Sequence, residues 1–240
     1  MKVKFLFVFV LVALGVYLGL SLQAYHWDVL ITYRTVFLKG WLTTVVLSLI
    51  SLVLSLCIGL FACLLRKSRL FLFRWIAQIY VELIRGTPLL VQLLIFFYVV
   101  AFALNIQNRY VVGVITLSLF SGAYIAEIFR SGIDSVRKTM LESATAIGLN
   151  TWQTYRYVIF PISIRQTLPP LAGQFTSIIK DSSLLSILGI SELTYAAQQV
   201  NSASYSTLES YFPLAIGYLI LTLPVSLISR YLEKRSRHEA

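Results

Sequence analysis

Charged side chains are scarce in this sequence. Asp, Glu, Lys and Arg together make up 12% of its 240 residues, against about 25% in ordinary soluble domains. Hydrophobic residues, by contrast, make up 58%. A chain with so few charges cannot cover its surface with groups that water solvates well. A soluble domain is therefore excluded, and we expect lipid to surround most of the chain.

Histidine and cysteine are also scarce, with two residues of each. His26 and His238 lie near opposite ends of the chain, so no cysteine–histidine cluster predicts a metal site. Cys57 and Cys63 share one apolar run, and their spacing points them to different sides of a helix, so we expect them to stay unpaired. The sequence contains no pair of nucleophile and base that would predict a catalytic site. The sequence also lacks the phosphate-binding motif G-x-x-x-x-G-K-[ST], so we do not expect this chain to hydrolyse ATP.

The charges that are present are unbalanced, with 20 Lys and Arg against 10 Asp and Glu. A net charge of +10 can indicate a nucleic-acid-binding protein. Here the basic residues flank apolar runs and form no basic patch interleaved with aromatic residues. Their placement therefore indicates membrane topology, and we expect no nucleic-acid partner.

Six stretches are apolar enough and long enough to cross a bilayer, which takes about 20 residues. They are Phe5–Ala24, Trp41–Leu65, Phe71–Leu104, Val111–Ile128, Val158–Ile179 and Tyr211–Ile228. The third and fifth are interrupted by proline or polar residues. The fold class predicted is therefore all-α, a polytopic bundle of membrane helices.

Basic residues concentrate on every second connection between these spans. The basic connections and ends hold Lys2, Lys4, Arg66, Lys67, Arg69, Arg74, Arg130, Arg137, Lys138, Arg156, Arg230, Lys234, Arg235 and Arg237. The opposite set holds Arg34, Lys39 and Arg109. Because cytoplasmic loops carry the excess of Lys and Arg, this alternation predicts a multi-pass membrane protein with both termini in the cytoplasm.

The first apolar stretch has two interpretations. Lys2 and Lys4 followed by an apolar run are also typical of a signal peptide, which would be cleaved after Ala24. The run is longer than the usual signal core, which favours a retained helix. Removal of the stretch would leave five spans with the amino terminus outside.

The connection between the fourth and fifth spans, residues 130–157, is long for so compact a chain, and long ordered loops tend to carry function. Within it, Thr139 and Glu142 have the spacing of a capping box. The predicted helix continues through Ile147, and Gly148 suits the left-handed position that ends a helix. Met140, Leu141, Ala144 and Ile147 fall on one side. The helix could lie against the protein's own spans or dock into a soluble partner.

The same segment resembles the EAA loop of ABC-importer permeases, whose pattern is E-A-A, three residues, G, nine residues and I-x-L-P. Glu142, Ala144, Gly148 and Pro161 keep both identity and spacing. Ser143 replaces the first alanine, Val158 the isoleucine and Phe160 the leucine, all modest changes of size. In that family the loop forms a coupling helix that sits in a cleft of a cytoplasmic ATPase. The resemblance therefore assigns ATPase coupling to Glu142, Ser143, Ala144, Gly148 and Pro161.

Further segments resemble the polar amino-acid branch of these permeases, closest in look to glutamine permeases. They are Gly40 with Thr43-Thr44, Tyr80–Gln92, Gly122–Glu127, Leu168–Leu171, Gly173-Gln174-Phe175, Lys180–Leu184 and Gly189–Leu193. The likeness covers about residues 37 to 235. It implies a five-helix, MetI-like permease core at 37–235 with its coupling loop at 130–157. Residues 1–36 would add a transmembrane helix and external linker, and residues 236–240 a cytoplasmic tail.

Polar residues at the interruptions are candidates for the substrate pathway: Gln174, Thr87, Gln92, Tyr124 and Lys180. Gln174 is the main one, because its amide can both donate and accept and so suits a zwitterion or a neutral amide. Relatives that carry cationic amino acids are often acidic near this position, which weakly disfavours arginine or histidine. An interhelical hydrogen bond is an equally open role for Gln174. Gly86 and Pro88 are expected to kink the third span, and Glu82 and Arg85 to be neighbours there.

The resemblance also implies a location, the bacterial inner membrane, and a set of partners. They are a cytoplasmic ABC ATPase dimer that binds the ATP and Mg, a second permease copy, identical or related, and an external amino-acid-binding protein. We expect no cofactor or metal in this chain and no enzymatic activity of its own. An autonomous channel or ion-coupled carrier remains the alternative from another class, and arginine, histidine, glutamate or cystine the alternative substrates.

Overall fold

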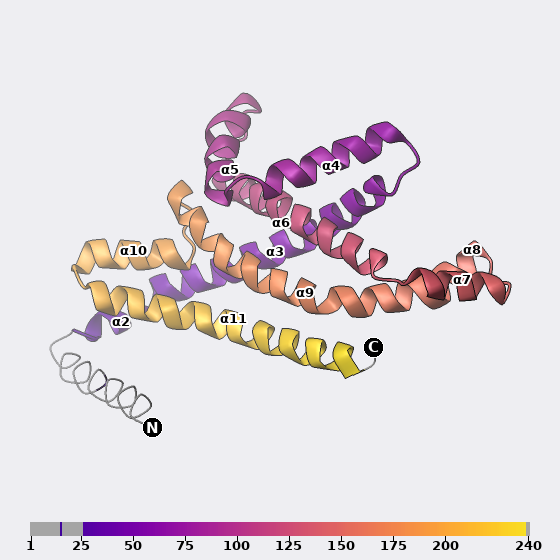
Figure 1. The fold of residues 1–240 in the computed structure, drawn as a ribbon. Coiled ribbons are helices and arrows are strands. Elements are labelled where there is room, and N and C mark those ends of the chain that lie inside the picture. The colour runs from indigo at the N-terminus through magenta and orange to yellow at the C-terminus, as the bar shows by residue number, and fades with distance from the viewer. Residues whose placement is uncertain (1–14, 16–25, 239–240) are drawn as a thin grey trace, which may run out of the picture.

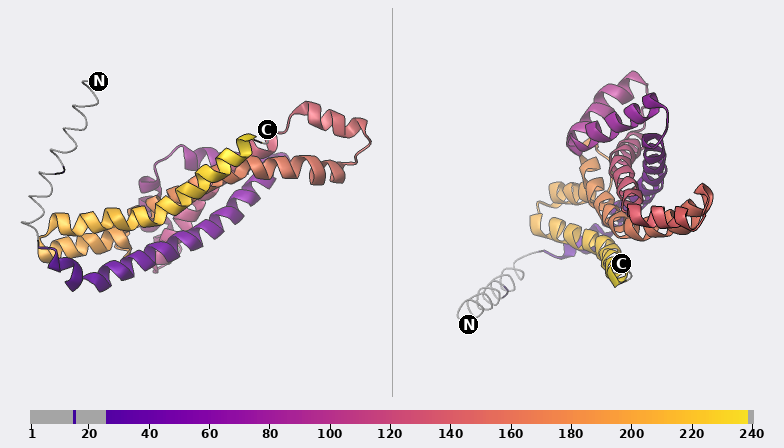
Figure 2. Two further views of the ribbon diagram at one scale, coloured as in Figure 1. Left: turned by 90° about the horizontal axis from the view of Figure 1, so that it is seen from below. Right: turned by 45° about the vertical axis from the view of Figure 1, so that its right-hand side comes forward.

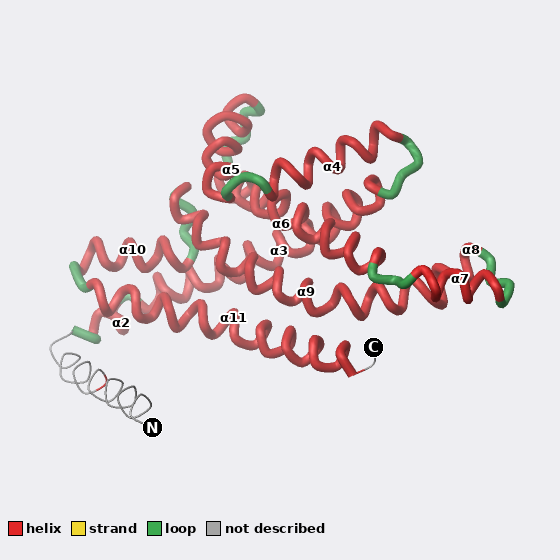
Figure 3. The backbone as a smooth tube through the Cα atoms, viewed as in Figure 1, coloured by secondary structure: helices red, strands yellow, loops and turns green. Residues whose placement is uncertain are grey.

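The computed structural model describes residue 15 and residues 26–238, with side chains through residue 234. The described part is helical, without a β-strand (Figure 3). The long helices are α3 (Arg34–Arg66), α6 (Arg109–Asp134), α9 (Phe160–Asp181) and α11 (Thr207–His238). Shorter ones are α2 (Asp28–Thr32), α4 (Phe71–Arg85), α5 (Leu89–Ile95), α7 (Lys138–Ala146), α8 (Thr151–Thr154) and α10 (Leu193–Ser204). Two π-helices, η1 (Phe96–Ala101) and η2 (Tyr155–Ile159), and a 3₁₀-helix, η3 (Ser182–Leu188), complete the chain.

Three of the described helices, α3, α6 and α11, are long and apolar enough to cross a membrane. The prediction of spans at these places is confirmed, with each helix longer than expected. The third predicted span is two pieces, because α4 and the α5–η1 segment meet at an angle of 110°. That bend is far sharper than a kink. The first predicted span, Phe5–Ala24, lies outside the described residues.

The fifth predicted span corresponds to α9, and its behaviour differs from the prediction in two ways. The sequence predicts an interruption of this span by proline or polar residues, but α9 is one helix through Pro169, Pro170 and Gly173. Packing against α11, α6 and α3 supports it where the prolines remove helical hydrogen bonds. It is also too polar to count as a span by composition, although its 22 residues are long enough. A long helix that packs against the bundle on one side and is polar on the other is typical of a lining for a polar cavity.

Small side chains bring α3 and α6 together at the centre of the bundle. A Cβ on Gly59 would lie 2.6 Å from Ile125, and one on Gly122 would lie 2.7 Å from Ile58. Membrane helices associate through such close approach because lipid removes the hydrophobic driving force between them. The resulting core is finished by residues of α5, α9 and η3: Leu89, Leu93, Ile178, Leu185 and Leu188.

Different helices lie at the two ends of the molecule (Figure 1). At one end α2, α10 and the start of α11 lie together. At the other end α7 and α8 extend beyond the ends of the long helices as an arm (Figure 2, left). The two ends of the bundle therefore carry different kinds of structure.

Candidate functional site

The arm formed by α7, α8 and η2 contains the predicted coupling residues. Glu142 and Ser143 are exposed, whereas Ala144 is buried beneath them. Ile147, 76% exposed, lies at the helix end, and Met140 is also exposed. With Leu149 and Val158 these residues line a shallow apolar hollow. The arm thus presents apolar side chains together with one exposed carboxylate, that of Glu142.

The N-terminus of α7 differs from the prediction. The helix begins at Lys138, one residue before Thr139, and its N-cap residue Arg137 makes no side-chain cap. The predicted capping box of Thr139 and Glu142 is therefore wrong, since Thr139 is already inside the helix. That leaves the Glu142 carboxylate at the surface. A capping box forms instead at α8, where Asn150 and Gln153 exchange two hydrogen bonds of 2.9 Å.

The C-terminus of α7 is as predicted. Gly148 has a φ of +81°, in the left-handed region that glycine adopts without strain. Its amide donates to the carbonyl of Thr145 and the Leu149 amide donates to Ala144, both at 3.0 Å. This pair of bonds is the Schellman motif, which satisfies the last carbonyls of a helix. α7 is therefore a short helix with a sharply defined end.

Pro161, the last residue of the resembling segment, lies at the start of α9. A proline fits the first turn of a helix, because that position needs no amide donor. The π-helix η2 leads directly into it. The backbone is continuous helix from α8 through η2 into α9, whereas α7 joins α8 through the turn at residues 147–150. Because α7 packs against α8 and η2, a displacement of α7 can reach α9 through that packing.

A cluster of ionic side chains, centred on Glu127 of α6, joins three helices near the base of the arm. The Glu127 carboxylate accepts from Arg66 of α3 at 2.7 Å, pairs with Arg130 and lies 3.8 Å from Arg85 of α4. Asp134 extends the cluster through Arg130 at 2.7 Å and Lys67 at 3.2 Å. The sequence had suggested Glu82 as the neighbour of Arg85. Instead Glu82 accepts from Gln78, and the Arg85 guanidinium lies over the ring of Tyr124.

A cleft of about 250 Å³ opens beside this cluster. Arg85, Tyr124 and Glu127 line one side, and Gln166 and Pro170 of α9 line the other. The cleft therefore brings a cation, a carboxylate, an aromatic ring and an amide within one small space. Of the predicted pathway residues it contains Tyr124. Reasoning from sequence missed Arg85, Glu127 and Gln166 as a group, although Glu127 ends one of the resembling segments.

Thr87 and Gln92 lie together at the bend between α4 and α5. The Gln92 amide nitrogen donates to the Ile84 carbonyl at 2.7 Å and contacts the Thr87 hydroxyl at 2.8 Å. Gly86 and Pro88 break the helix here, which frees carbonyls at the end of α4. The buried Gln92 side chain supplies the missing donor. The geometry thus gives Gln92 a structural role in holding the 110° bend.

Gln174 and Lys180 belong to one side of α9 that the rest of the chain leaves open. Gln166, Pro170, Gly173, Ser177 and Lys180 follow one another at spacings of three and four residues, so they share a helix face. Gln174, partly buried, flanks this face. We call these six residues the α9 polar face. The structure does not bring Gln174 or Lys180 together with Thr87 and Gln92.

The comparisons with known proteins place the chain in a family. Residues 55–238 match the family of binding-protein-dependent transport system inner membrane components. The chain is 35% identical to the glutamine transport system permease protein GlnP of Escherichia coli strain K12, over 89% of this chain and 98% of that one. It is 37% identical to the probable amino-acid ABC transporter permease protein YckA of Bacillus subtilis strain 168, over 84% of this chain and 89% of that one.

Solved structures agree. A crystal structure of an amino acid ABC transporter with histidines superposes with a TM-score of 0.81 at 33% identity, covering 88% of this chain and 98% of that one. The MetNI methionine ABC transporter, at 13% identity, matches in fold with a TM-score of 0.70. The chain belongs to the inner-membrane component family of binding-protein-dependent transport systems. It is a multi-pass membrane permease of the ABC-importer type with a MetI-like fold.

Proposed function

We propose that this chain is the permease subunit of an ATP-driven importer that moves a polar amino acid, with glutamine the leading candidate, into the bacterial cytoplasm. The single observation that carries the mechanism is the arm. The capped helix α7 extends beyond the bundle and packs against α8 and η2, which continue into α9, the helix with the polar face. Such a helix can pass a displacement from a soluble motor to the pathway.

The motor in this proposal is a separate ATPase dimer, which binds the ATP and Mg. Each ATPase subunit grips one α7 through the exposed Glu142, Ser143 and Ile147 and the hollow beside Met140. Closure of the ATPases moves the two arms and opens the pathway outward, where an external binding protein releases its amino acid. The arm is then cytoplasmic, and so are the chain termini. The permease domain proper would span residues 37–235.

The pathway in this proposal lies between two copies of the permease, identical or related. A twofold axis would place the α9 polar face of each copy opposite its counterpart. Gln174, Ser177 and Lys180 would then line a shared cavity that leads to the cleft of Arg85, Tyr124 and Glu127. A zwitterion needs donors for its carboxylate and acceptors for its ammonium group, and Arg85 and Glu127 supply one of each.

The substrate assignment rests on chemistry as well as on relatives. The α9 polar face offers amides, a hydroxyl and one cation, and no carboxylate of its own. Neutral amide groups match the side chain of glutamine, whereas a cationic substrate would call for an acidic partner. One relative is named as a glutamine permease, which supports this choice, and another as a probable amino-acid permease, which supports an amino-acid substrate in general.

Coupling is tested by reversing the charge of Glu142. Because Glu142 is exposed on α7, Glu142→Lys should leave the bundle intact and weaken ATPase binding about tenfold. Co-purification with the ATPase measures the affinity. Asp28→Lys, which reverses an exposed carboxylate on α2 at the opposite end, is the matched control and should keep the ATPase bound. Equal binding by both variants would exclude α7 as the docking element.

The pathway is tested by Gln174→Ala. We expect slower uptake of glutamine in proteoliposomes that contain the ATPase and the binding protein, with unchanged assembly of the complex. The loss removes a donor and an acceptor from the α9 polar face. Uptake kinetics identical to those of the original chain would remove Gln174 from the pathway and favour its role as a hydrogen bond within the bundle.

A further inference from the structure

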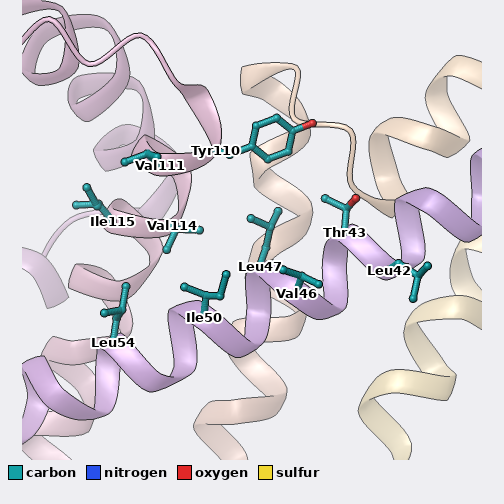
Figure 4. A pocket seen from close by; sticks show the side chains of 10 residues that line it. All are labelled: Leu42, Thr43, Val46, Leu47, Ile50, Leu54, Tyr110, Val111, Val114 and Ile115. Atoms are coloured by element: carbon teal, nitrogen blue, oxygen red, sulfur yellow. The ribbon is translucent and has the colours of Figure 1, made fainter.

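An apolar groove of about 560 Å³ runs between α3 and α6 (Figure 4). Leu47 and Val114, which are 4% and 9% exposed, form its floor. Val46 of α3 and Val111 of α6 line its sides and are 52% and 43% exposed, so the groove is open on its outer side. In a membrane bundle, an open apolar surface of this kind is covered either by lipid or by another helix.

The groove has the length of one leaflet of a bilayer. On α3 it runs from Leu42 to Leu54, which is about 18 Å at 1.5 Å per residue. Half of a hydrocarbon core of about 30 Å is about 15 Å. Thr43 and Tyr110, the lining residues with hydroxyl groups, lie toward the end of the groove that is opposite the arm (Figure 4). The dimensions therefore suit one acyl chain in the leaflet on that side.

Two exposed cations flank the same end of the groove, one on each helix. Lys39 precedes Thr43 by one turn of α3, and the Thr43 hydroxyl donates to the Lys39 carbonyl at 2.9 Å, so the two residues share a side of the helix. Arg109 begins α6, and its guanidinium lies 6.0 Å from the centre of the Tyr110 ring. Within residues 26–234, neither cation pairs with a carboxylate. The apolar groove thus ends between two cations that lack a counter-charge.

We propose that the α3–α6 groove binds one anionic phospholipid of the phosphatidylglycerol type, from the leaflet opposite the arm. An acyl chain lies along the aliphatic walls, and the phosphate lies between Lys39 and Arg109. The Tyr110 hydroxyl can donate to an ester oxygen at the end of the groove. A zwitterionic headgroup would bring its ammonium group beside two cations, and like charges repel, so a headgroup with a net negative charge fits better.

A second copy of the chain is the other candidate to cover the groove, and charge disfavours it. In a twofold dimer with its axis along the membrane normal, the same patch of both copies meets at the same depth. Lys39 and Arg109 would then approach the same two cations of the other copy. The lining of the groove contains no carboxylate that could separate them. A lipid phosphate, by contrast, supplies the opposite charge.

Native mass spectrometry of the full-length permease in detergent tests the headgroup contacts. The protein is stripped of lipid, and phosphatidylglycerol is added back to measure its affinity. Lys39→Gln and Arg109→Gln should each weaken binding about fivefold, because each removes one cation near the phosphate. Arg34→Gln is the matched control. It removes an exposed cation at the same end of α3, nine residues from Thr43 and so on the opposite side of the helix, and should leave the affinity unchanged.

The acyl-chain contacts are tested by filling the groove. Val46→Trp places a large side chain in it and should abolish the tight binding of phosphatidylglycerol. Leu49→Trp is the matched control, because Leu49 is similarly exposed on α3, at 56%, but does not line the groove. That variant should bind as the original chain does. Phosphatidylcholine, whose headgroup is zwitterionic, should bind about fivefold more weakly than phosphatidylglycerol.

Three results would overturn the proposal. Equal weakening by Arg34→Gln, or unchanged binding by Val46→Trp, would mean that the lipid belongs to a general shell around the protein. Phosphatidylcholine bound as tightly as phosphatidylglycerol would mean that the two cations do not read the headgroup. A dimer that Val46→Trp dissociates without any change in lipid affinity would make the groove an interface between copies. The measurement needs no substrate, ATPase or nucleotide, so its failure would leave the proposed transport function untouched.

Discussion

The left-handed Gly148 at the end of α7 gives the sharpest test of the arm as a rigid element. In Gly148→Ala, the new methyl group would meet no described atom within 4 Å. Steric clash therefore contributes nothing, and the effect comes from the φ of +81° alone. A residue with a Cβ is less stable in the left-handed region by about 1–2 kcal/mol. The unfolded alanine variant has lower conformational entropy than the unfolded glycine chain, which offsets roughly 0.4–1 kcal/mol of that destabilisation.

The net cost is about 1 kcal/mol, which lowers the ratio of capped to frayed helix ends about fivefold. The amides that report this are those of Gly148 and Leu149, whose hydrogen bonds to Thr145 and Ala144 form the cap. In the alanine variant, position 148 and Leu149 should exchange hydrogen about fivefold faster. Uptake per ATP hydrolysed should fall as well, since a frayed helix transmits less displacement.

Gly148→Asn is the matched control, because asparagine tolerates the left-handed region better than alanine does. It should retain more of the protection and more of the coupling. Hydrogen exchange read by mass spectrometry, and uptake in proteoliposomes, measure the two effects. If alanine protected the cap as well as glycine does, or if asparagine and alanine behaved alike, the reasoning from backbone conformation would be refuted.

Three other substitutions test the bundle through thermal unfolding in detergent. Gly132→Ala would place a Cβ 2.2 Å from the Thr167 methyl carbon and should lower the free energy of unfolding by roughly 1–3 kcal/mol. Adding Thr167→Ser, which removes that methyl group, should restore part of the lost stability. If it restored none, the loss would have another cause. Gln92→Leu takes away the donor to the buried Ile84 carbonyl and should cost about 1–3 kcal/mol; an unchanged melting temperature would mean that the bend does not need it. Glu127→Gln should cost only about 1 kcal/mol, because its partners are partly exposed, with a smaller loss in high salt; a salt-independent loss would contradict an ionic origin.

The sequence predicted the spans wherever the pattern was simple. α3, α6 and α11 are continuous apolar runs, so length and hydropathy located them. For α4 and α5 the sequence predicts one kinked span, because a Gly and a Pro indicate a break without giving its angle. The 110° bend depends on Gln92 reaching back to Ile84, a contact that periodicity does not reveal. The prediction that prolines interrupt the fifth span is wrong, because packing with three other helices supports α9 as one helix.

The candidate site was predicted unevenly for similar reasons. The prediction that Gly148 ends the helix in a left-handed conformation is confirmed, because such a helix end leaves a local signal in the sequence, namely a glycine just after the helix. The capping box was wrong because Thr139 and Glu142 have the required spacing whether the helix begins at 139 or at 138. The Glu127 cluster joins α3, α4 and α6, and its members lie up to 68 residues apart in sequence, from Arg66 to Asp134. Contacts of that range follow from the fold and not from any local pattern.

The most direct test of the central claim is glutamine uptake by proteoliposomes assembled from this permease, its ATPase and its binding protein. We predict uptake that requires ATP and the binding protein together and that Glu142→Lys abolishes without preventing membrane insertion. Uptake by the permease alone, without nucleotide, would contradict the account and would make the chain an autonomous carrier.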